Sequence, residues 1–377
     1  MKYMGSKSAM LSQGLGNILT DRRFDSGDFV DLFAGSGVVA QWRATRSAQS
    51  VTSVDTQVYS RVLSSAVLER TETLDVKVFE DWFDSCVRIH ERISARYSEQ
   101  DEVISRGVVL AEREHAAEYS ENFFITRDYG GHYYSLRQAL ALDVISRELN
   151  RLSGDAYLVC RAALVAVASR CAASPGHTAQ PFQPTDKLLP HIHAARSRDP
   201  FEYLWFYIVK LANECARTLG RAVSTSAALF IESSLRDESV VFCDPPYSDV
   251  QYSRFYHVLE GIAIGGYPSV SGAGRSPALE ERYSSPFSNR SEAPIAFDNL
   301  LKSLSVKSSR VILTFPDHDC SNGMSARTLA QLAERYFAVE TYAVSMRHSS
   351  LGGGGTDSGS RLASRQVQES VLVCMPR

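Results

Sequence analysis

Two patterns of apolar residues divide the chain. Both ends carry short apolar runs bounded by glycine, proline or acidic residues, which is typical of strands in an open α/β sheet. The runs predict strands early in residues 28–40 and at residues 51–55, 227–232, 240–243, 311–315, 337–342 and 368–375. A short helix is expected over residues 8–19. The fold class predicted is therefore a Rossmann-like α/β sheet.

The middle of the chain has a different pattern. Between about Gln57 and Val223, apolar residues recur at three- and four-residue spacings, as they do on the buried faces of helices. The spacings predict helices near residues 76–98, 103–120, 133–152, 155–173 and 199–222. This stretch is too long for one crossover connection. We therefore expect a helical insert over residues 71–223, which divides the sheet domain into residues 1–70 and 224–377.

Four segments interrupt these patterns. Residues 173–185 contain several prolines and are followed by cations, so they predict either a surface connector or a nucleic-acid contact loop. The cations considered for DNA contact are Lys187, His191, Arg196 and Arg198. Residues 129–134 form a second candidate loop. Residues 268–292 and 348–365 are predicted to be loops, the first able to order on a ligand.

Composition and charge narrow the class of protein. The formal net charge is -3, so any binding of nucleic acid must use a local basic patch. The seven cysteines are dispersed and form no C-x-x-C pair, which favours reduced thiols in a cytoplasmic protein and argues against a zinc or other metal site. The sequence shows no apolar signal region and no span long enough to cross a membrane.

The first candidate for ligand binding lies in residues 28–40. Gly35 and Gly37 follow an apolar strand and allow a tight turn in which the backbone can approach a ligand. The third glycine of the dinucleotide fingerprint is absent, which counts against NAD. Asp55 ends the next strand, where an acid can bind a ribose diol or cap the following helix; the glycine turn upstream favours the ribose role.

The second candidate follows the apolar run Val240–Cys243. Pro245 and Pro246 cannot donate to a sheet ladder, so the strand must end there. Asp244 and Tyr247 are therefore expected on a stiff turn at the carboxyl end of a strand. Open α/β sheets bind their ligands at that edge.

Together these motifs resemble the D12 class of DNA adenine-N6 methyltransferases. The segment from Lys2 to Lys7 is similar to the N-terminal cofactor segment of that family, and residues 31–37 look like its glycine-rich motif. Residues 231–233 resemble the strand end before the catalytic strand, and residues 255–257 a downstream Phe/Tyr-His segment. The cofactor-binding residues that the resemblance implies are Tyr3, Lys7, Asp31, Phe33, Gly35, Gly37, Asp55, Glu232 and Asp244. The catalytic residues are Asp244, Pro245, Pro246 and Tyr247.

The resemblance implies transfer of a methyl group from S-adenosylmethionine to the N6 amine of a flipped-out adenine in double-stranded DNA. Asp244 and the Pro245 carbonyl would each accept one amino hydrogen, and Tyr247 would stack on the base. No metal is required. The partners implied are DNA and the other subunits of a restriction-modification or phage-defence system, and the helical insert would recognise the target.

The resemblance covers residues 1–70 and 225–377, and the middle departs from it. Residues 176–183 stand where the family usually has an Asn-rich segment before a Pro-Phe-Gly turn. Three alternatives follow. A cytosine-N4 methyltransferase more often has Ser before Pro-Pro-Tyr, so Asp244 favours adenine. RNA adenine or guanine methyltransferases share the motif. A catalytically silent nucleic-acid-binding subunit is disfavoured because the motif is intact.

Overall fold

The computed structural model describes residues 7–95, 104–249, 251–348 and 365–377. The chain forms two compact units. The sheet unit comprises Gly5–Thr56, Arg217–Tyr252 and Ser284–Arg377, and the helical unit contains Gln57–Ala216 and Ser253–Tyr283. Both units are therefore built from separated stretches of sequence.

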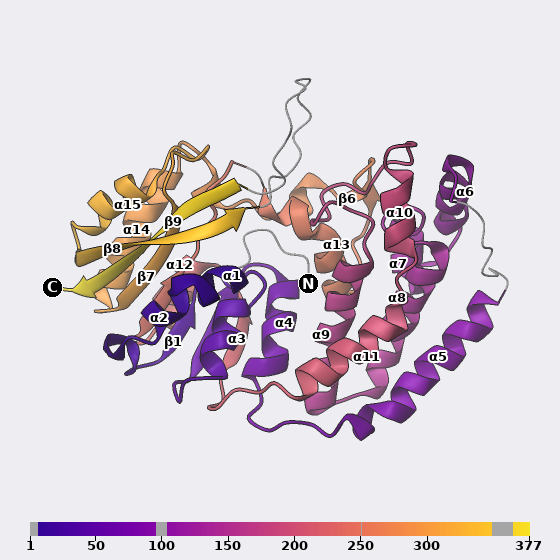
Figure 1. The fold of residues 1–377 in the computed structure, drawn as a ribbon, viewed down its shortest axis with the longest axis horizontal. Helices are drawn as coiled ribbons and strands as arrows, with labels where there is room; N and C mark the ends of the chain where they lie inside the picture. Colours follow the sequence, from indigo (N-terminus) through magenta and orange to yellow (C-terminus); the bar gives the residue numbers. More distant parts are fainter. Residues whose placement is uncertain (1–6, 96–103, 250, 349–364) are drawn as a thin grey trace. The chain divides into compact units, whose positions relative to one another are not determined.

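The sheet unit is organised by a 7-stranded sheet with the order β3-β2-β1-β4-β7-β9-β8 (Figure 1). The strands are β1 (Phe29–Asp31), β2 (Val51–Asp55), β3 (Arg221–Ser224), β4 (Val240–Cys243), β7 (Arg310–Pro316), β8 (Phe337–His348) and β9 (Arg365–Pro376). The first five are parallel, and β9 runs antiparallel to both β7 and β8. The Rossmann-like α/β fold expected from the sequence is confirmed.

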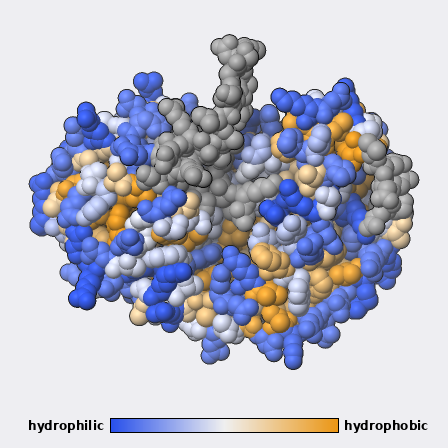
Figure 2. Space-filling view, viewed as in Figure 1, coloured by the Kyte–Doolittle hydropathy of each residue, from blue (hydrophilic) through white to orange (hydrophobic). Residues whose placement is uncertain are grey.

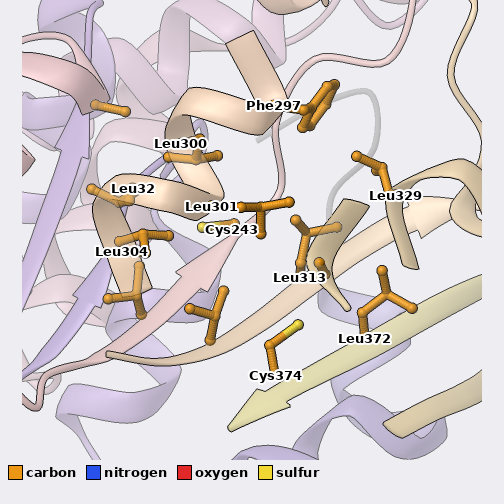
Figure 3. Close-up of a cluster of buried hydrophobic side chains, with 14 of the residues drawn as sticks. Leu32, Cys243, Phe297, Leu300, Leu301, Leu304, Leu313, Leu329, Leu372 and Cys374 are labelled. Carbon is orange, nitrogen blue, oxygen red and sulfur yellow. The ribbon is translucent and has the colours of Figure 1, made fainter. Parts of the chain in front are cut away.

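Helices cover both faces of this sheet. On one face lie α12 (Ala227–Ser233), α14 (Ala293–Val306) and α15 (Ala326–Ala333), which pack on Val30 of β1 and on Leu313 and Leu372. Figure 3 shows the leucines of α14 meeting side chains of the central strands. Neighbouring residues in a strand point to opposite faces. Accordingly Phe29 lies against Arg43 of α3 (Val38–Ala44), which covers the other face.

The sheet has one topological switch point. From β1 the chain extends the sheet through β2 and β3 on one side and through β4 and β7 on the other. The two central strands remain joined beyond their ends, because the Leu32 amide donates to the Phe242 carbonyl at 3.0 Å. Ligands of open α/β sheets bind at the carboxyl ends of the strands beside such a point. This places the candidate site just after Asp31 and Cys243.

The helical unit is built around α9 (Gly154–Cys171), most of which is buried. It packs on α4 (Val58–Leu68), α8 (Leu136–Glu148) and α11 (Pro200–Ala212). The other described helices are α5 (Glu80–Ser94), α6 (Arg106–Ala117), α7 (Phe124–Tyr129), α10 (Leu189–Arg196) and α13 (Tyr252–Ile264). Side-chain caps define several helix starts: Ser135 and Gln138 form a capping box at α8, and Asp199 caps α11.

Two strand and helix predictions were wrong. Residues 227–232 form helix α12, not a strand, because a five-residue apolar run also fits one buried face of a helix, and the Ser226 side chain caps its first turn. The missed strand, β3, begins at Arg221, at the end of the helix predicted over residues 199–222; α11 ends at Ala212. This strand is short, lies at the sheet edge and begins with an exposed arginine, so it lacks an apolar run.

The predicted N-terminal helix is present but broken. It consists of α1 (Ser8–Met10), a π-helical turn (Leu11–Leu15) and α2 (Gly16–Leu19). Gly14, with φ 141, causes the break, since this backbone conformation is available to glycine and rarely to other residues. A Cβ atom added at Gly14 would contact the Val344 side chain of β8.

The predicted loop at residues 268–292 has local structure. It contains the two-stranded pair β5 (Val270–Ser271) and β6 (Ser276–Pro277) and two 3-10 turns, Leu279–Glu281 and Pro286–Ser288. Most of the loop predicted at residues 348–365 lies outside the described residues.

The cysteines are unpaired and the surface is mainly hydrophilic, as the amino-acid composition predicts. All seven cysteines are free. Figure 2 shows mainly hydrophilic residues with hydrophobic ones scattered among them, as on an ordinary protein surface. Within the described ranges, no helix combines the length and the apolar character needed to cross a membrane.

Candidate active site

The glycine turn after β1 is held by the end of β2. Gly35 and Gly37 have φ values of 51 and 73, which strain residues with a Cβ atom. The Gly35 amide donates to Asp55 Oδ2 at 2.8 Å, and the Ala34 amide donates to the Val54 carbonyl at 3.0 Å. Asp55 therefore fixes the shape of the turn, a role that the sequence did not reveal.

Asp31, the last residue of β1, is buried below this turn. Its carboxyl group accepts backbone N–H groups of Phe33 and Ala40, while its Oδ1 has no hydrogen-bond partner among the described residues. Burial raises the pKa of Asp31 to about 8, and the negative charges of Asp244 and Asp55 contribute to the rise. At pH 7 the group is therefore mainly protonated, and a cation beside it would favour ionisation.

Strand β4 ends at Cys243, and Asp244 follows at the switch point. Its Oδ1 accepts a hydrogen bond from Thr314 Oγ1 of β7 at 2.8 Å and forms an ion pair with Lys7 Nζ at 3.0 Å. The Asp244 side chain retains 21% exposure, so a ligand can reach it. Pro245 is buried and Pro246 half-buried, as expected for a stiff turn at the strand end.

Lys7 links Asp244 to a second acid. Its Nζ donates to Glu369 Oε2 of β9 at 2.9 Å, and the two side chains are 4% and 0% exposed. Burial acts to lower the pKa of Lys7, but the carboxylates of Asp244 and Glu369 outweigh it and raise that pKa. Lys7 is therefore charged throughout the physiological pH range. Glu369 and Thr314 were missed in the sequence: Thr314 is one polar residue in an apolar strand, and Glu369 lies beside the polar residues Gln368 and Ser370.

Tyr247 lies beside Asp244 on the same turn. Its ring meets Phe315 edge-on with centroids 6.1 Å apart, and its hydroxyl hydrogen-bonds with the Tyr252 side chain. Burial raises the pKa of Tyr247 well above its usual range, so the hydroxyl stays neutral. The ring is half-buried and can offer a face to a planar ligand.

The two substitutions of Tyr247 should differ. For the methyl transfer that the family resemblance implies, we expect Tyr247→Phe to retain most activity, because stacking needs the ring face and not the hydroxyl. Tyr247→Ala should reduce the rate by roughly 5- to 150-fold, since base–aromatic stacking contributes about 1–3 kcal/mol. Turnover of both variants with labelled cofactor measures the difference. Equal losses in the two variants would assign the role to the hydroxyl.

The remaining predicted cofactor residues are spread more widely. Phe33 is half-buried in the glycine turn, where its ring meets Phe287 edge-on at 5.2 Å. Phe287 was not predicted, although it presents a second aromatic ring here. Glu232 was predicted at a strand end, but it is exposed on helix α12. There it lines a groove of about 780 Å³ between α12 and α14. Tyr3 lies outside the described residues.

The predicted nucleic-acid residues of the helical unit fall into two pairs. Lys187 and His191 are exposed. Arg196 instead forms an ion pair with Glu112 at 2.5 Å and is 6% exposed, while Arg198 donates to the Arg170 carbonyl at 2.6 Å. The exposed pair can therefore meet a phosphate without breaking an ion pair or hydrogen bond that the described residues show, although the His191 ring packs on Phe182.

The site has the charge that a sulfonium cofactor requires. Lys7 pairs with both Asp244 and Glu369, and Asp31 lies near the carboxyl groups of Asp244 and Asp55. S-adenosylmethionine carries a net positive charge. The unpartnered, buried Asp31 Oδ1 is one acceptor for it, and Asp55 beside the glycine turn is another. These residues therefore fit the cofactor.

Comparison with known proteins gives consistent results. The family model of the D12 class N6 adenine-specific DNA methyltransferases matches residues 3–179 and 208–313. The chain is 26% identical over 317 residues to Type II methyltransferase M.FokI of Planomicrobium okeanokoites, covering 80% of this chain and 42% of the relative. It is 23% identical over 352 residues to Modification methylase LlaI of Lactococcus lactis subsp. lactis, covering 90% and 49%.

A third relative, Modification methylase StsI of Streptococcus sanguinis, is 22% identical over 323 residues, covering 84% of this chain and 44% of the relative. The chain thus spans less than half the length of the curated relatives it matches. The family match takes in the glycine turn, Asp55 and the Asp-Pro-Pro-Tyr turn, which the fold brings to one sheet edge. The chain therefore belongs to the D12 class N6 adenine-specific DNA methyltransferase family.

Proposed function

We propose that this protein transfers a methyl group from S-adenosylmethionine to the N6 amine of adenine in double-stranded DNA. The observation that carries the proposal is the position of Asp244, partly exposed at the switch point of the sheet, between the glycine turn and the Pro-Pro turn. Family membership supplies the chemistry.

The residues of the chain suit this reaction. When bound, S-adenosylmethionine would supply an electrophilic methyl group: the N6–carbon bond forms as the carbon–sulfur bond breaks, S-adenosylhomocysteine leaves, and the surplus proton on N6 is then lost to solvent. The amine of adenine is a poor nucleophile because its lone pair is delocalised into the ring. Asp244 accepts one amino hydrogen and the Pro245 carbonyl accepts the other, which favours a pyramidal nitrogen with a directed lone pair. Pro245 and Pro246 hold that carbonyl in place, and Tyr247 stacks on the base.

Three residues contact the cofactor in this proposal. Asp55 binds the ribose diol, Asp31 the positively charged amino-acid end, and Phe33 in the glycine turn contributes an aromatic face. The base must leave the duplex to reach Asp244, as in other enzymes that modify bases. We propose that the protein acts in a restriction-modification system in the cytoplasm; the names of the relatives, a Type II methyltransferase and two modification methylases, and the free thiols support this proposal.

A methyl-transfer assay tests the proposal. The full chain is incubated with methyl-labelled S-adenosylmethionine and either bacterial DNA that lacks adenine methylation or RNA transcribed from the same sequences. We expect label in DNA and none in RNA. Label in RNA alone would identify an RNA methyltransferase, and binding of DNA without transfer would identify a silent subunit.

We also propose that the helical insert, residues 71–223, contacts DNA and selects the target, because the cofactor and Asp-Pro-Pro-Tyr motifs lie outside it. Lys187→Gln combined with His191→Gln should weaken DNA binding and reduce the slope of log affinity against log salt by about 1, the value for one lost phosphate contact. Binding is measured by fluorescence anisotropy between 50 and 200 mM salt, roughly the range in which such losses are visible.

Two comparisons make this test specific. Lys302→Gln removes an exposed lysine from α14 of the sheet unit and should leave the salt slope unchanged. Arg196 is not substituted, because its loss would leave Glu112 buried without its cation and destabilise the unit. An unchanged slope in the Lys187 and His191 double variant would show that this loop is only structural.

A further inference from the structure

The catalytic carboxylate belongs to a buried cluster of three charged groups. Lys7 Nζ lies 3.0 Å from Asp244 Oδ1 and 2.9 Å from Glu369 Oε2. Glu369 is completely buried, whereas Asp244 remains partly exposed. Burying a carboxylate costs free energy unless it is paired, so Glu369 is maintained in this position by Lys7. The cluster joins Lys7, the residue after β4 and the first half of β9.

Among the described residues, the hydrogen bond and the ion pair of the Asp244 side chain fall on one oxygen. Both the Thr314 hydroxyl and the Lys7 ammonium group bind Oδ1. Two donors on one oxygen fix the plane of the carboxylate and leave Oδ2 to accept the amino hydrogen in the proposed reaction. A productive geometry at a reacting group must be held within about 0.5 Å, which requires supporting contacts of this kind.

The charge of the cluster also matters. Lys7 alone would neutralise Asp244 and cancel its attraction for the positive charge that develops on the amine nitrogen. With Glu369 present, one cation faces two carboxylates, and the cluster retains a net negative charge. Preorganised charge of this sign stabilises the transition state in a site from which water is largely excluded.

We propose that Glu369 and Thr314 are positioning residues for methyl transfer: through Lys7 and through Oδ1, they orient the Asp244 carboxylate and keep the cluster negatively charged. This inference rests on the proposed function, in which Asp244 accepts an amino hydrogen. Neither residue touches the reacting atoms in this account.

The pH dependence of the reaction should report this role. Asp244 is faced by Lys7, by Glu369 of β9, by Asp31 of β1 and by the hydroxyls of Tyr247 and Tyr252. Burial raises the pKa of Asp244, Lys7 opposes the rise, and Glu369 adds to it. Asp244 must be ionised to act, so the rate increases with pH through its pKa. Removing the Glu369 charge should lower that pKa and displace the acid limb to lower pH.

Glu369→Gln is the variant that tests the proposal. It keeps the size and one acceptor for Lys7 but removes the charge. In single turnover with saturating labelled S-adenosylmethionine and unmethylated bacterial DNA, we expect the plateau rate to fall by about tenfold or more, with the acid limb at lower pH. The loss should lie in kcat, with KM for DNA changed less than about twofold.

Matched variants separate positioning from folding. Ser370→Ala alters the next residue of β9, whose hydroxyl binds Asp317 Oδ1 at 2.7 Å, and should leave rate and pH profile unchanged. Thr314→Val should lower the rate, and Thr314→Ser should restore it because the hydroxyl returns. Melting temperatures of all variants identify any that fail to fold.

A measurement without turnover distinguishes the two proposals. The ¹³C carboxyl resonance of Asp244, assigned with Asp244→Asn, is titrated in cofactor-free protein. Its pKa should fall in Glu369→Gln and stay unchanged in Ser370→Ala. An unshifted pKa, or a wild-type rate and pH profile in Glu369→Gln, would overturn the positioning role alone. If the Asp244 pKa shifts in Glu369→Gln but the wild-type protein methylates no nucleic acid, the charge coupling would be supported and the proposed function rejected.

Discussion

Replacing Asp244 with alanine is expected to abolish methyl transfer while leaving the chain folded. The side chain lies after the end of β4, where it faces ligand and not core. Lys7 keeps its ion pair with Glu369 when Asp244 is removed, so no buried charge is left unpaired. The assay is incorporation of labelled methyl groups into DNA, with the melting temperature as the check on folding.

Asp244→Asn is the sharper form of this substitution. It retains the size and one acceptor oxygen but loses the negative charge that matches the developing ammonium. We expect turnover to fall by at least about a hundredfold, as for the loss of one preorganised electrostatic contact. We expect Tyr247→Phe to be the most active of three variants, Tyr247→Ala to be less active, and Asp244→Ala to have no detectable activity. Full activity in Asp244→Ala would show that the Asp-Pro-Pro-Tyr motif only ends a strand and has no catalytic role.

Asp55→Ala should weaken binding of S-adenosylmethionine by about 1.5–3 kcal/mol, the range for hydrogen bonds to a charged group. This corresponds to roughly 10- to 150-fold in Kd. Part of the loss comes from the glycine turn, because Asp55 Oδ2 accepts the Gly35 amide. Isothermal titration calorimetry with the cofactor measures the change.

Asp55→Asn separates the two contributions. The amide oxygen can still accept the Gly35 amide, so the turn is retained while the charge is lost. We expect this variant to bind the cofactor with an affinity between those of the wild type and Asp55→Ala. Unchanged calorimetric affinity in Asp55→Ala would reject the ribose assignment.

The central strands and their turns could be predicted from sequence because their signals are local. The run before Asp244 is apolar, and two prolines end it; the run before the glycine turn is apolar as well. Such strands are buried on both faces, so they carry a continuous apolar signal. The structure has β4 and β1 at these places, adjacent in the sheet.

The cluster around Asp244 could not be predicted, because its partners are distant in the sequence. Lys7 and Glu369 are separated by 362 positions. A lysine at the start of a chain resembles any solvent-exposed cation, and a single glutamate in a strand resembles an outward-facing residue. Only the pairing of β9 with β7 brings Glu369 to the site.

Two other differences show how tertiary context overrides local pattern. An apolar run at residues 227–232 predicts a strand, but the Ser226 cap and the packing of Phe230 and Ile231 on the core make it helix α12. Arg196 predicts a phosphate contact by its charge, yet Glu112 binds it within the helical unit. Burial of a charged side chain in an ion pair is invisible in the sequence alone.

Nucleoside analysis of DNA tests the central claim most directly. DNA from cells that express the wild-type chain or Asp244→Ala, in a host lacking other adenine methyltransferases, is digested to nucleosides and quantified by mass spectrometry. The account predicts N6-methyladenine with the wild type and none with Asp244→Ala. N4-methylcytosine in place of N6-methyladenine, or equal N6-methyladenine with both proteins, would contradict it.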